Sequence, residues 1–295
     1  MTDPLLRLYP PAYRAAHGQE IVDVHREMTA DMPRAARLRA DADLAAHAVR
    51  VRLGLDSVSP AGRFFALAAP FALAAGAVDN GLRLTRWYEG LVRSPAPVWV
   101  QLSTMDAARA VHLLLSLLVC LGAVIALTGR WLPGAGVAVC GLLGTAAQWA
   151  VTAPSPGEGA AAPVTAALLT AAVVLSCPPD RRGDRQLSTA AAVMAAAGWF
   201  PVVVVDTRAF GVTTDYGAWP MLVLALTGAV LAVRARSSGL RELGAMAVAS
   251  SPLVAHAYTD AWLELRPVLG LFLLLPVSAA LTACFQAVRR RRRLR

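Results

Sequence analysis

The run "AVHLLLSLLVCLGAVIALT", residues 110–128, decides the fold. It contains no Asp, Glu, Arg or Lys, and a helix of about 20 mainly apolar residues is long enough to cross the hydrocarbon core of a bilayer. Six further runs of this kind follow it, at residues 131–152, 161–177, 187–205, 218–233, 243–257 and 267–288. The sequence therefore predicts an all-α, polytopic transmembrane helical bundle.

The composition supports the same class. Of 295 residues, 57% are hydrophobic and 16% charged, whereas soluble domains have about 45–50% apolar and about 25% charged residues. All 28 basic residues are Arg, which excludes a Walker-type phosphate loop because that loop needs a Lys. The four Cys lie in or at the end of apolar runs, and no pair has metal-ligand spacing. We expect no cofactor, no metal and no enzymatic activity.

The Arg residues of the loops predict the topology, because cytoplasmic loops are enriched in basic residues. Every second loop is the more basic one, and the tail 289–295 holds six Arg. This pattern places the C-terminus in the cytoplasm. The first 63 residues hold nine Arg, so they are predicted to be cytoplasmic as well, and a weaker apolar run at 64–79 supplies the crossing that this requires. We expect about eight spans in the cell (inner) membrane, with both termini cytoplasmic.

One segment fits this topology poorly. Residues 80–109, predicted to be external, contain four Arg, and Trp and Tyr residues in the same segment favour a position along the membrane interface. If 64–79 only dips into the membrane, the topology has seven spans and an external N-terminal segment. Both alternatives remain open at this point.

Polar composition sets the N-terminal part apart. Residues 1–55 are predicted to form a cytoplasmic head of three short helices, and Gly54 is predicted to be a helix C-cap. Residues 56–63 would be a hinge, residues 64–288 the transmembrane bundle, and residues 289–295 a cytoplasmic tail. The tail is predicted to fix topology and to contact anionic lipid through Arg289, Arg290, Arg291, Arg292 and Arg293.

The head contains a short motif in "LYPPAYRAAHGQE", residues 8–20. Leu8, Tyr9, Pro10, Tyr13, Arg14, Gly18 and Glu20 resemble an N-terminal signature, LYPxxYRxxxGxE, of actinobacterial integral membrane proteins of unknown function. A related form precedes the membrane portion of some permease subunits of ATP-binding-cassette exporters. The resemblance covers about 20 residues, and this chain lacks the large extracytoplasmic domain that those permeases have after the first span.

Two interpretations of this motif are possible. In the structural one, Tyr9 and Tyr13 cover Ile21 and Val24, Gly18 reverses the chain with a positive φ, and Arg14 pairs with Glu20. In the functional one, Tyr9, Pro10, Tyr13, Arg14, Gly18 and Glu20 form a docking face for a cytoplasmic protein partner.

The body offers little chemistry by sequence. Asp79, Asp206 and Asp260, with His112 and His256, are predicted to lie at or near span ends, and the absence of ionisable residues inside the spans argues against proton-coupled transport. Gly136, Cys140 and Gly144 repeat at four-residue spacing and predict a close helix contact, within the chain or between two copies.

We therefore expect a membrane-anchored regulatory or adaptor protein, with the bilayer and a cytoplasmic protein as partners and no nucleic acid. The alternative suggested by the resemblance is a permease-like subunit that works with a separate ATPase. An enzyme acting on lipid-linked substrates would need a polar cluster at one membrane face. Its candidates, Asp206, Asp215, Asp260 and Glu264, have no recognisable spacing.

Overall fold

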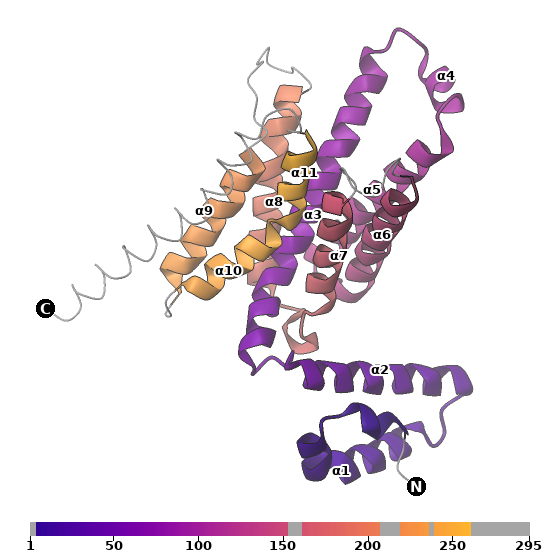
Figure 1. Cartoon of the computed structure of the whole chain (residues 1–295), viewed down its shortest axis with the longest axis vertical. Helices are drawn as coiled ribbons and strands as arrows, with labels where there is room; N and C mark the ends of the chain where they lie inside the picture. The colour runs from indigo at the N-terminus through magenta and orange to yellow at the C-terminus, as the bar shows by residue number, and fades with distance from the viewer. Residues whose placement is uncertain (1–3, 153–160, 207–218, 236–238, 261–295) are drawn as a thin grey trace, which may run out of the picture. The chain divides into compact units, whose positions relative to one another are not determined.

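The computed structural model describes residues 4–152, 161–206, 219–235 and 239–260, and divides the chain into two compact units, Met1–Arg63 and Phe64–Arg295 (Figure 1). All regular elements in the described ranges are helices: η1 Pro4–Leu8, α1 Pro11–Thr29, α2 Arg34–Leu53, α3 Pro60–Arg93, α4 Val98–Ser103, α5 Ala107–Leu127, α6 Trp131–Thr152, α7 Ala161–Leu175, η2 Pro179–Arg181, α8 Arg185–Asp206, α9 Trp219–Arg234, α10 Leu240–Ala249 and α11 Ser251–Asp260.

Tyr9 is the largest fully buried side chain in the described part of the first unit. Tyr9 is fully buried, stacks on Tyr13 at 5.4 Å between ring centroids, and meets the ring of His47 edge-on at 5.7 Å. Its hydroxyl donates a hydrogen bond of 3.4 Å to the carbonyl of Leu44. Tyr9 thereby ties the N-terminal segment to α2. Among the residues of this unit whose burial the structure describes, 6–63, the buried apolar side chains are Tyr9, Ala48 and Leu55, so the core of this part is thin.

The ends of the helices follow their sequence signals. Pro11 begins α1, where its missing N–H costs no hydrogen bond. The prediction for Gly54 is confirmed: it follows α2 in the left-handed region with φ of 63°, and its N–H bonds to Val51 O. The next N–H, of Leu55, bonds to Arg50 O at 2.8 Å. Gly54 therefore satisfies carbonyls that the end of α2 would otherwise leave open.

Three details predicted for the motif are wrong. Gly18 does not reverse the chain but lies buried inside the continuous helix α1, without a positive φ. Glu20 is paired with His17, one turn earlier, at 3.8 Å. Tyr9 and Tyr13 stack together and face His47 of α2, and Val24, which they were predicted to cover, is 49% exposed. A glycine inside a helix costs only about 1 kcal/mol relative to alanine, so helical hydrogen bonding prevails over the break.

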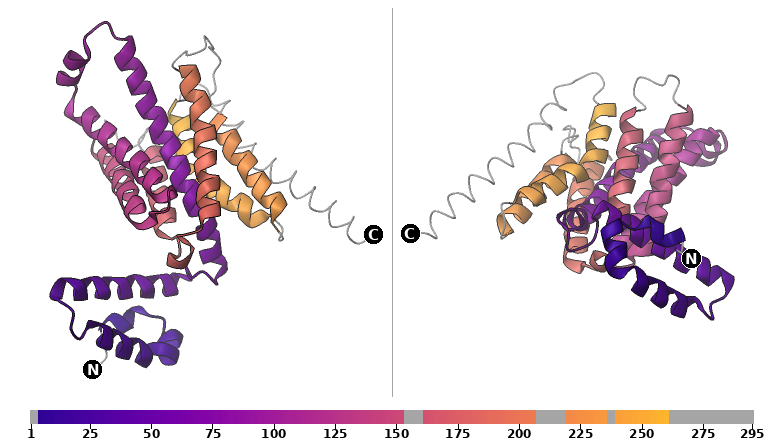
Figure 2. Two further views of the ribbon diagram at one scale, coloured as in Figure 1. Left: turned by 180° about the vertical axis from the view of Figure 1, so that it is seen from behind. Right: turned by 60° about the horizontal axis from the view of Figure 1, so that its bottom comes forward.

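In the second unit, α3 is the central helix. Its residues from Ala68 to Leu82 are almost all buried. Cys120 of α5 donates to Ala77 O at 3.5 Å, and Trp199 of α8 donates from Nε1 to Thr85 Oγ1 at 3.3 Å. Figure 2 shows α8 alongside α3. Neighbours on several sides thus enclose α3, which explains how Pro70 is accommodated within it.

Helices α5 and α6 pack at very short range through small residues. A Cβ on Gly122 would lie 2.7 Å from Gly134 O, and one on Gly134 would lie 2.6 Å from Gly122 O. These glycines let the two backbones touch, as small residues do in membrane helix pairs. As a contact within the chain, the predicted face is wrong at Gly136, where an added Cβ would meet nothing within 4 Å, and at Cys140, which is exposed. Gly144 does pack within the chain, against Leu115. The contact uses a neighbouring face of α6, because α5 meets Gly134 and Ala138.

The described residues contain four helices that are long and apolar enough to cross a membrane, α3, α5, α6 and α8, and two shorter apolar helices, α7 and α9. Two predicted boundaries are wrong. The run 64–79 is only part of α3, which continues to Arg93, so residues 80–93 are helical rather than a loop. The run 243–257 is divided between α10 and α11. The predicted span 267–288 and the Arg tail lie outside the described residues.

Candidate functional site

Asp79 is enclosed near the middle of α3, contrary to the expectation that water reaches it at a span end. Its side chain is only 12% exposed. With 34 residues, α3 is about 51 Å long at 1.5 Å per residue, which exceeds the hydrocarbon thickness of about 30 Å. The expected span end therefore falls within the helix, and Asp79 lies among packed helices.

Two basic side chains meet this carboxylate. Asp79 Oδ1 lies 2.7 Å from Nδ1 of His256 in α11, and it accepts a hydrogen bond of 3.2 Å from Nε of Arg83, one turn later in α3. The side chain of His256 is 9% exposed and that of Arg83 is 18% exposed. A buried charge needs a partner of this kind, since an isolated carboxylate in an apolar interior is very costly.

Polar groups next to Asp79 are satisfied by α3 itself. Asn80 donates from Nδ2 to Gly76 O at 2.8 Å, and Thr85 donates from Oγ1 to Gly81 O at 2.9 Å. These bonds back to the preceding turn allow polar residues to stand inside an apolar bundle without breaking the helix. They also explain why the polar stretch after residue 79 continues as helix rather than leaving the bundle as a loop.

A small cavity of about 20 Å³ borders the ion pair. Besides Asp79, Asn80 and Arg83, its lining includes Thr145 of α6 and Pro163 of α7. That volume is enough for about one water molecule, which needs polar partners in order to stay. The carboxylate, amide and guanidinium supply such partners, so the cavity can hold one water molecule beside Asp79.

The chain is interrupted beside the ion pair. Helix α10 ends at Ala249 and α11 begins at Ser251, and the two meet at an angle (Figure 1). Pro252 explains the break because it has no N–H to donate to the preceding turn. Pro252 and Ala255 of α11 also line the small cavity. His256 therefore projects from a short helix whose joint with α10 is next to the site.

The sequence interpretation missed this site because it assigned Asp79 and His256 separately to span ends. One signal was present: Asp79 and Arg83 have the four-residue spacing of a helical ion pair, which indicates that the helix continues past residue 79. No sequence signal linked them to His256.

The predicted head residues do not gather into one exposed face. Tyr9 is buried, while Arg14 and Tyr13 are half-buried, and Glu20 is exposed. Pro10 directly precedes α1, and Gly18 lies inside it. These positions fit a role in folding for Tyr9 and Tyr13. The tail residues Arg289 to Arg293 and the proposed acidic residues Asp215 and Glu264 lie outside the described residues, as do the side chains of Asp206 and Asp260.

The net charge of the site depends on the protons carried by two side chains. Asp79 and Arg83 cancel, so the state of His256 and the uptake of a proton at Asp79 decide its net charge. In the parts of α5, α6 and α7 that the structure describes, His112 is the titratable residue close enough to interact electrostatically with both Asp79 and Arg83.

No protein family, curated protein or solved structure matches the chain.

Proposed function

We propose that the transmembrane unit is the permease-like part of a transport system, in which the Asp79–His256 pair takes up and releases a proton. The observation that supports this proposal is the 2.7 Å contact between these two buried side chains, which joins the central helix to the short helix α11. Ionisable residues in this setting are costly and mark proton or substrate pathways more often than they serve packing.

Because the chain is interrupted between α10 and α11, protonation of Asp79 can lead to a movement of α11. A proton on the Asp79 carboxyl removes its charge and weakens its attraction to Arg83 and His256. Helix α11 then loses its main polar tie to α3 and can shift about Ser250. Interrupted helices at a buried polar site are the usual way in which carriers combine binding with movement.

The test is a pH titration of the purified full chain in lipid vesicles, followed by infrared absorption of protonated carboxyl groups. The expected result is a titrating carboxyl band that Asp79→Asn abolishes and His256→Gln displaces along the pH axis. The matched control is Asp106→Asn, at the exposed N-cap of α5, which leaves that band in place. A band that survives Asp79→Asn would contradict proton uptake at Asp79.

The finer topology belongs to the same proposal: eight spans with both termini cytoplasmic. Arg-rich alternate loops support it, while a seven-span arrangement with an external head is the competing topology. Single cysteines at Ala15, Ser94 and Gly183, in a chain without its native cysteines, test both points, because only the seven-span topology places the exposed residue 15 outside. Membrane-impermeant labelling from outside is expected at position 94 and not at 15 or 183. Labelling at 15 would favour seven spans, and labelling at 183 would reverse the orientation.

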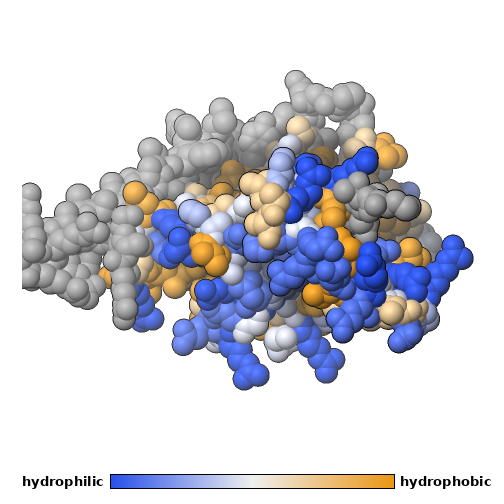
Figure 3. Space-filling model, turned by 90° about the horizontal axis from the view of Figure 1, so that it is seen from below, coloured by the Kyte–Doolittle hydropathy of each residue, from blue (hydrophilic) through white to orange (hydrophobic). Residues whose placement is uncertain are grey.

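A second candidate, the membrane-anchored adaptor, is favoured by one observation in the first unit. Helix α2 exposes apolar residues along one face, including Leu38 at 62%, Val49 at 49% and Leu53 at 61%. Ala42 and Ala46 lie between them at helical spacing and are exposed as well. The face drawn in Figure 3 is mostly hydrophilic, with hydrophobic side chains among the charged ones. Such a stripe suits an amphipathic partner helix.

Co-purification from native membranes, read by quantitative mass spectrometry, tests the adaptor function. Leu38→Glu combined with Leu53→Glu should remove a protein, such as a transcriptional regulator or an ATPase, that the unaltered chain retains. The matched control is Val58→Glu, an apolar residue of the same unit that is 82% exposed and lies outside α2. Loss of the same protein in both variants, or in neither, would exclude the α2 face as its binding site.

A further inference from the structure

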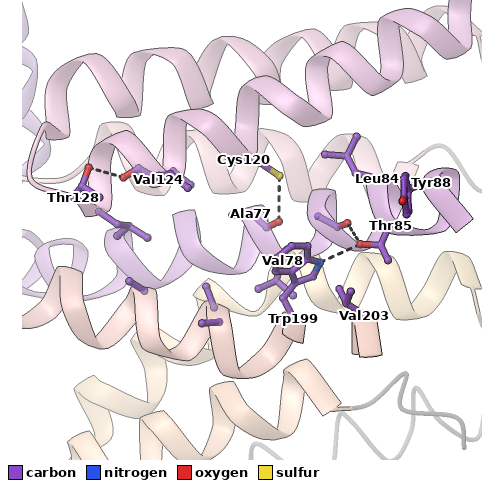
Figure 4. A pocket seen from close by; sticks show the side chains of 16 residues that line it. Ala77, Val78, Leu84, Thr85, Tyr88, Cys120, Val124, Thr128, Trp199 and Val203 are labelled. Carbon is purple, nitrogen blue, oxygen red and sulfur yellow. Dashed lines mark hydrogen bonds between the residues drawn. The ribbon is translucent and has the colours of Figure 1, made fainter. Parts of the chain in front are cut away.

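The side of α3 opposite Asp79 borders a much larger cavity, of about 650 Å³. Its walls are α3, α5 and α8, all of which are long and apolar enough to cross a membrane. Small residues make room for it, notably Ala77 and Gly81 of α3, Ala123 of α5 and Ala195 of α8. Figure 4 shows its lining side chains spread along the three helices.

The cavity is long rather than round. On α8 its lining extends from Ala192 to Val203, a rise of about 16 Å at 1.5 Å per residue. Tyr88 and Val203 lie at one end and Thr128 at the other (Figure 4). The side chains of Val124 and Trp199, which belong to different walls, are exposed by 59% and 40%. The cavity is therefore a groove that is open along its length.

Apart from the hydroxyl of Tyr88 at one end, the polar side-chain atoms that line this groove are already hydrogen-bonded within the protein. Trp199 donates to Thr85, and Thr85 in turn donates to Gly81 O. Cys120 donates to Ala77 O, and Thr128 donates to Val124 O at 2.8 Å. A polar ligand would have to enter an apolar groove and leave its own donors and acceptors without partners, which is unfavourable. The lining therefore selects hydrocarbon.

We propose that this groove between α3, α5 and α8 binds one acyl chain of a bilayer phospholipid. An extended chain matches an open, elongated and apolar groove whose walls are membrane-spanning helices. The phenol of Tyr88, 55% exposed at one end, is suited to the ester region of the same lipid, since Tyr rings favour the interface between hydrocarbon and water. This inference does not depend on the proton site, which lies on the other side of α3.

The test uses Trp199 as the reporter, in a full chain whose other Trp residues are replaced by Phe. The protein is reconstituted in phosphatidylcholine–phosphatidylglycerol vesicles whose acyl chains carry bromine, which quenches indole fluorescence on contact. Ala192→Phe with Val124→Phe fills the groove. The matched pair, Val193→Phe with Leu121→Phe, places the same two Phe side chains at exposed neighbours on the same two helices that do not line the groove.

The expected result is strong quenching of Trp199, lost in the filled variant and retained in the matched pair. Equal quenching in both pairs would show contact with bulk lipid only and would overturn the proposal. Absence of quenching in the parent would also overturn it, because the groove would then be covered by protein, either residues after 260 or a second copy. If the filled variant does not fold, native mass spectrometry of the unaltered chain decides, since a retained phospholipid supports the proposal and its absence contradicts it.

Discussion

The carboxylate of Asp79 in α3 lies 2.7 Å from the imidazole of His256 in α11. This contact joins the central helix to a segment near the end of the described chain, and Arg83 completes it on the α3 side. Charge, burial and the interrupted helix meet at this one place. The proposal of proton uptake rests on this contact, whereas the proposed acyl-chain groove lies on the opposite side of α3.

Asp79→Asn should destabilise the transmembrane unit. The amide cannot neutralise Arg83, and removing one member of a buried ion pair typically costs about 3–5 kcal/mol. Thermal unfolding in detergent should show a clearly lower midpoint for Asp79→Asn. The double variant Asp79→Asn with Arg83→Gln, which removes both charges, should recover part of the loss. An unchanged midpoint in the single variant would show that the pair is solvated and not enclosed as described.

Much of the fold could be predicted, but the site could not. Apolar runs predict helices α5 to α9 well, since length and hydrophobicity alone determine them. The path of α3 through Asp79 was missed because a polar residue after an apolar run has the same signature at a span end and inside a bundle. The difference comes from His256, a partner supplied by tertiary packing. Likewise, four-residue spacing identified small residues on α6 but could not say which face meets α5.

Gly134→Leu should prevent α5 and α6 from packing, whereas Gly136→Leu should be tolerated. Any side chain on Gly134 meets the backbone of α5, which cannot move aside as a flexible side chain would. Overpacking costs typically about 1–3 kcal/mol and can cost more, while Gly136 has open space around it. Yield and thermal midpoint of the two variants in the same detergent provide the comparison. Equal loss at both positions would point instead to a contact between copies through Gly136.

Pro252→Ala should straighten the joint between α10 and α11. Alanine at position 252 has the backbone N–H that proline lacks, so one continuous helix can form in place of α10 and α11. His256 would then turn away from Asp79, and the infrared band assigned to Asp79 should shift along the pH axis. Ala257→Gly, on the same helix but without an added N–H and outside the lining of the small cavity, serves as the control. An unaltered band in Pro252→Ala would separate the break from the proton site.

Acidification should loosen the first unit through His47. Burial, with the charge of Arg50 beside it, lowers the pKa of the His47 imidazole, so the unfolded chain binds the proton more readily than the folded one. The free energy of unfolding therefore falls as pH drops through the ordinary His range near about 6.5. Hydrogen-exchange protection of α2 amides in the full chain, corrected for intrinsic rates, should decrease between about pH 7.5 and about pH 5.5. His47→Gln should remove that decrease, because glutamine takes up no proton; the same decrease in the variant would assign the effect to another group.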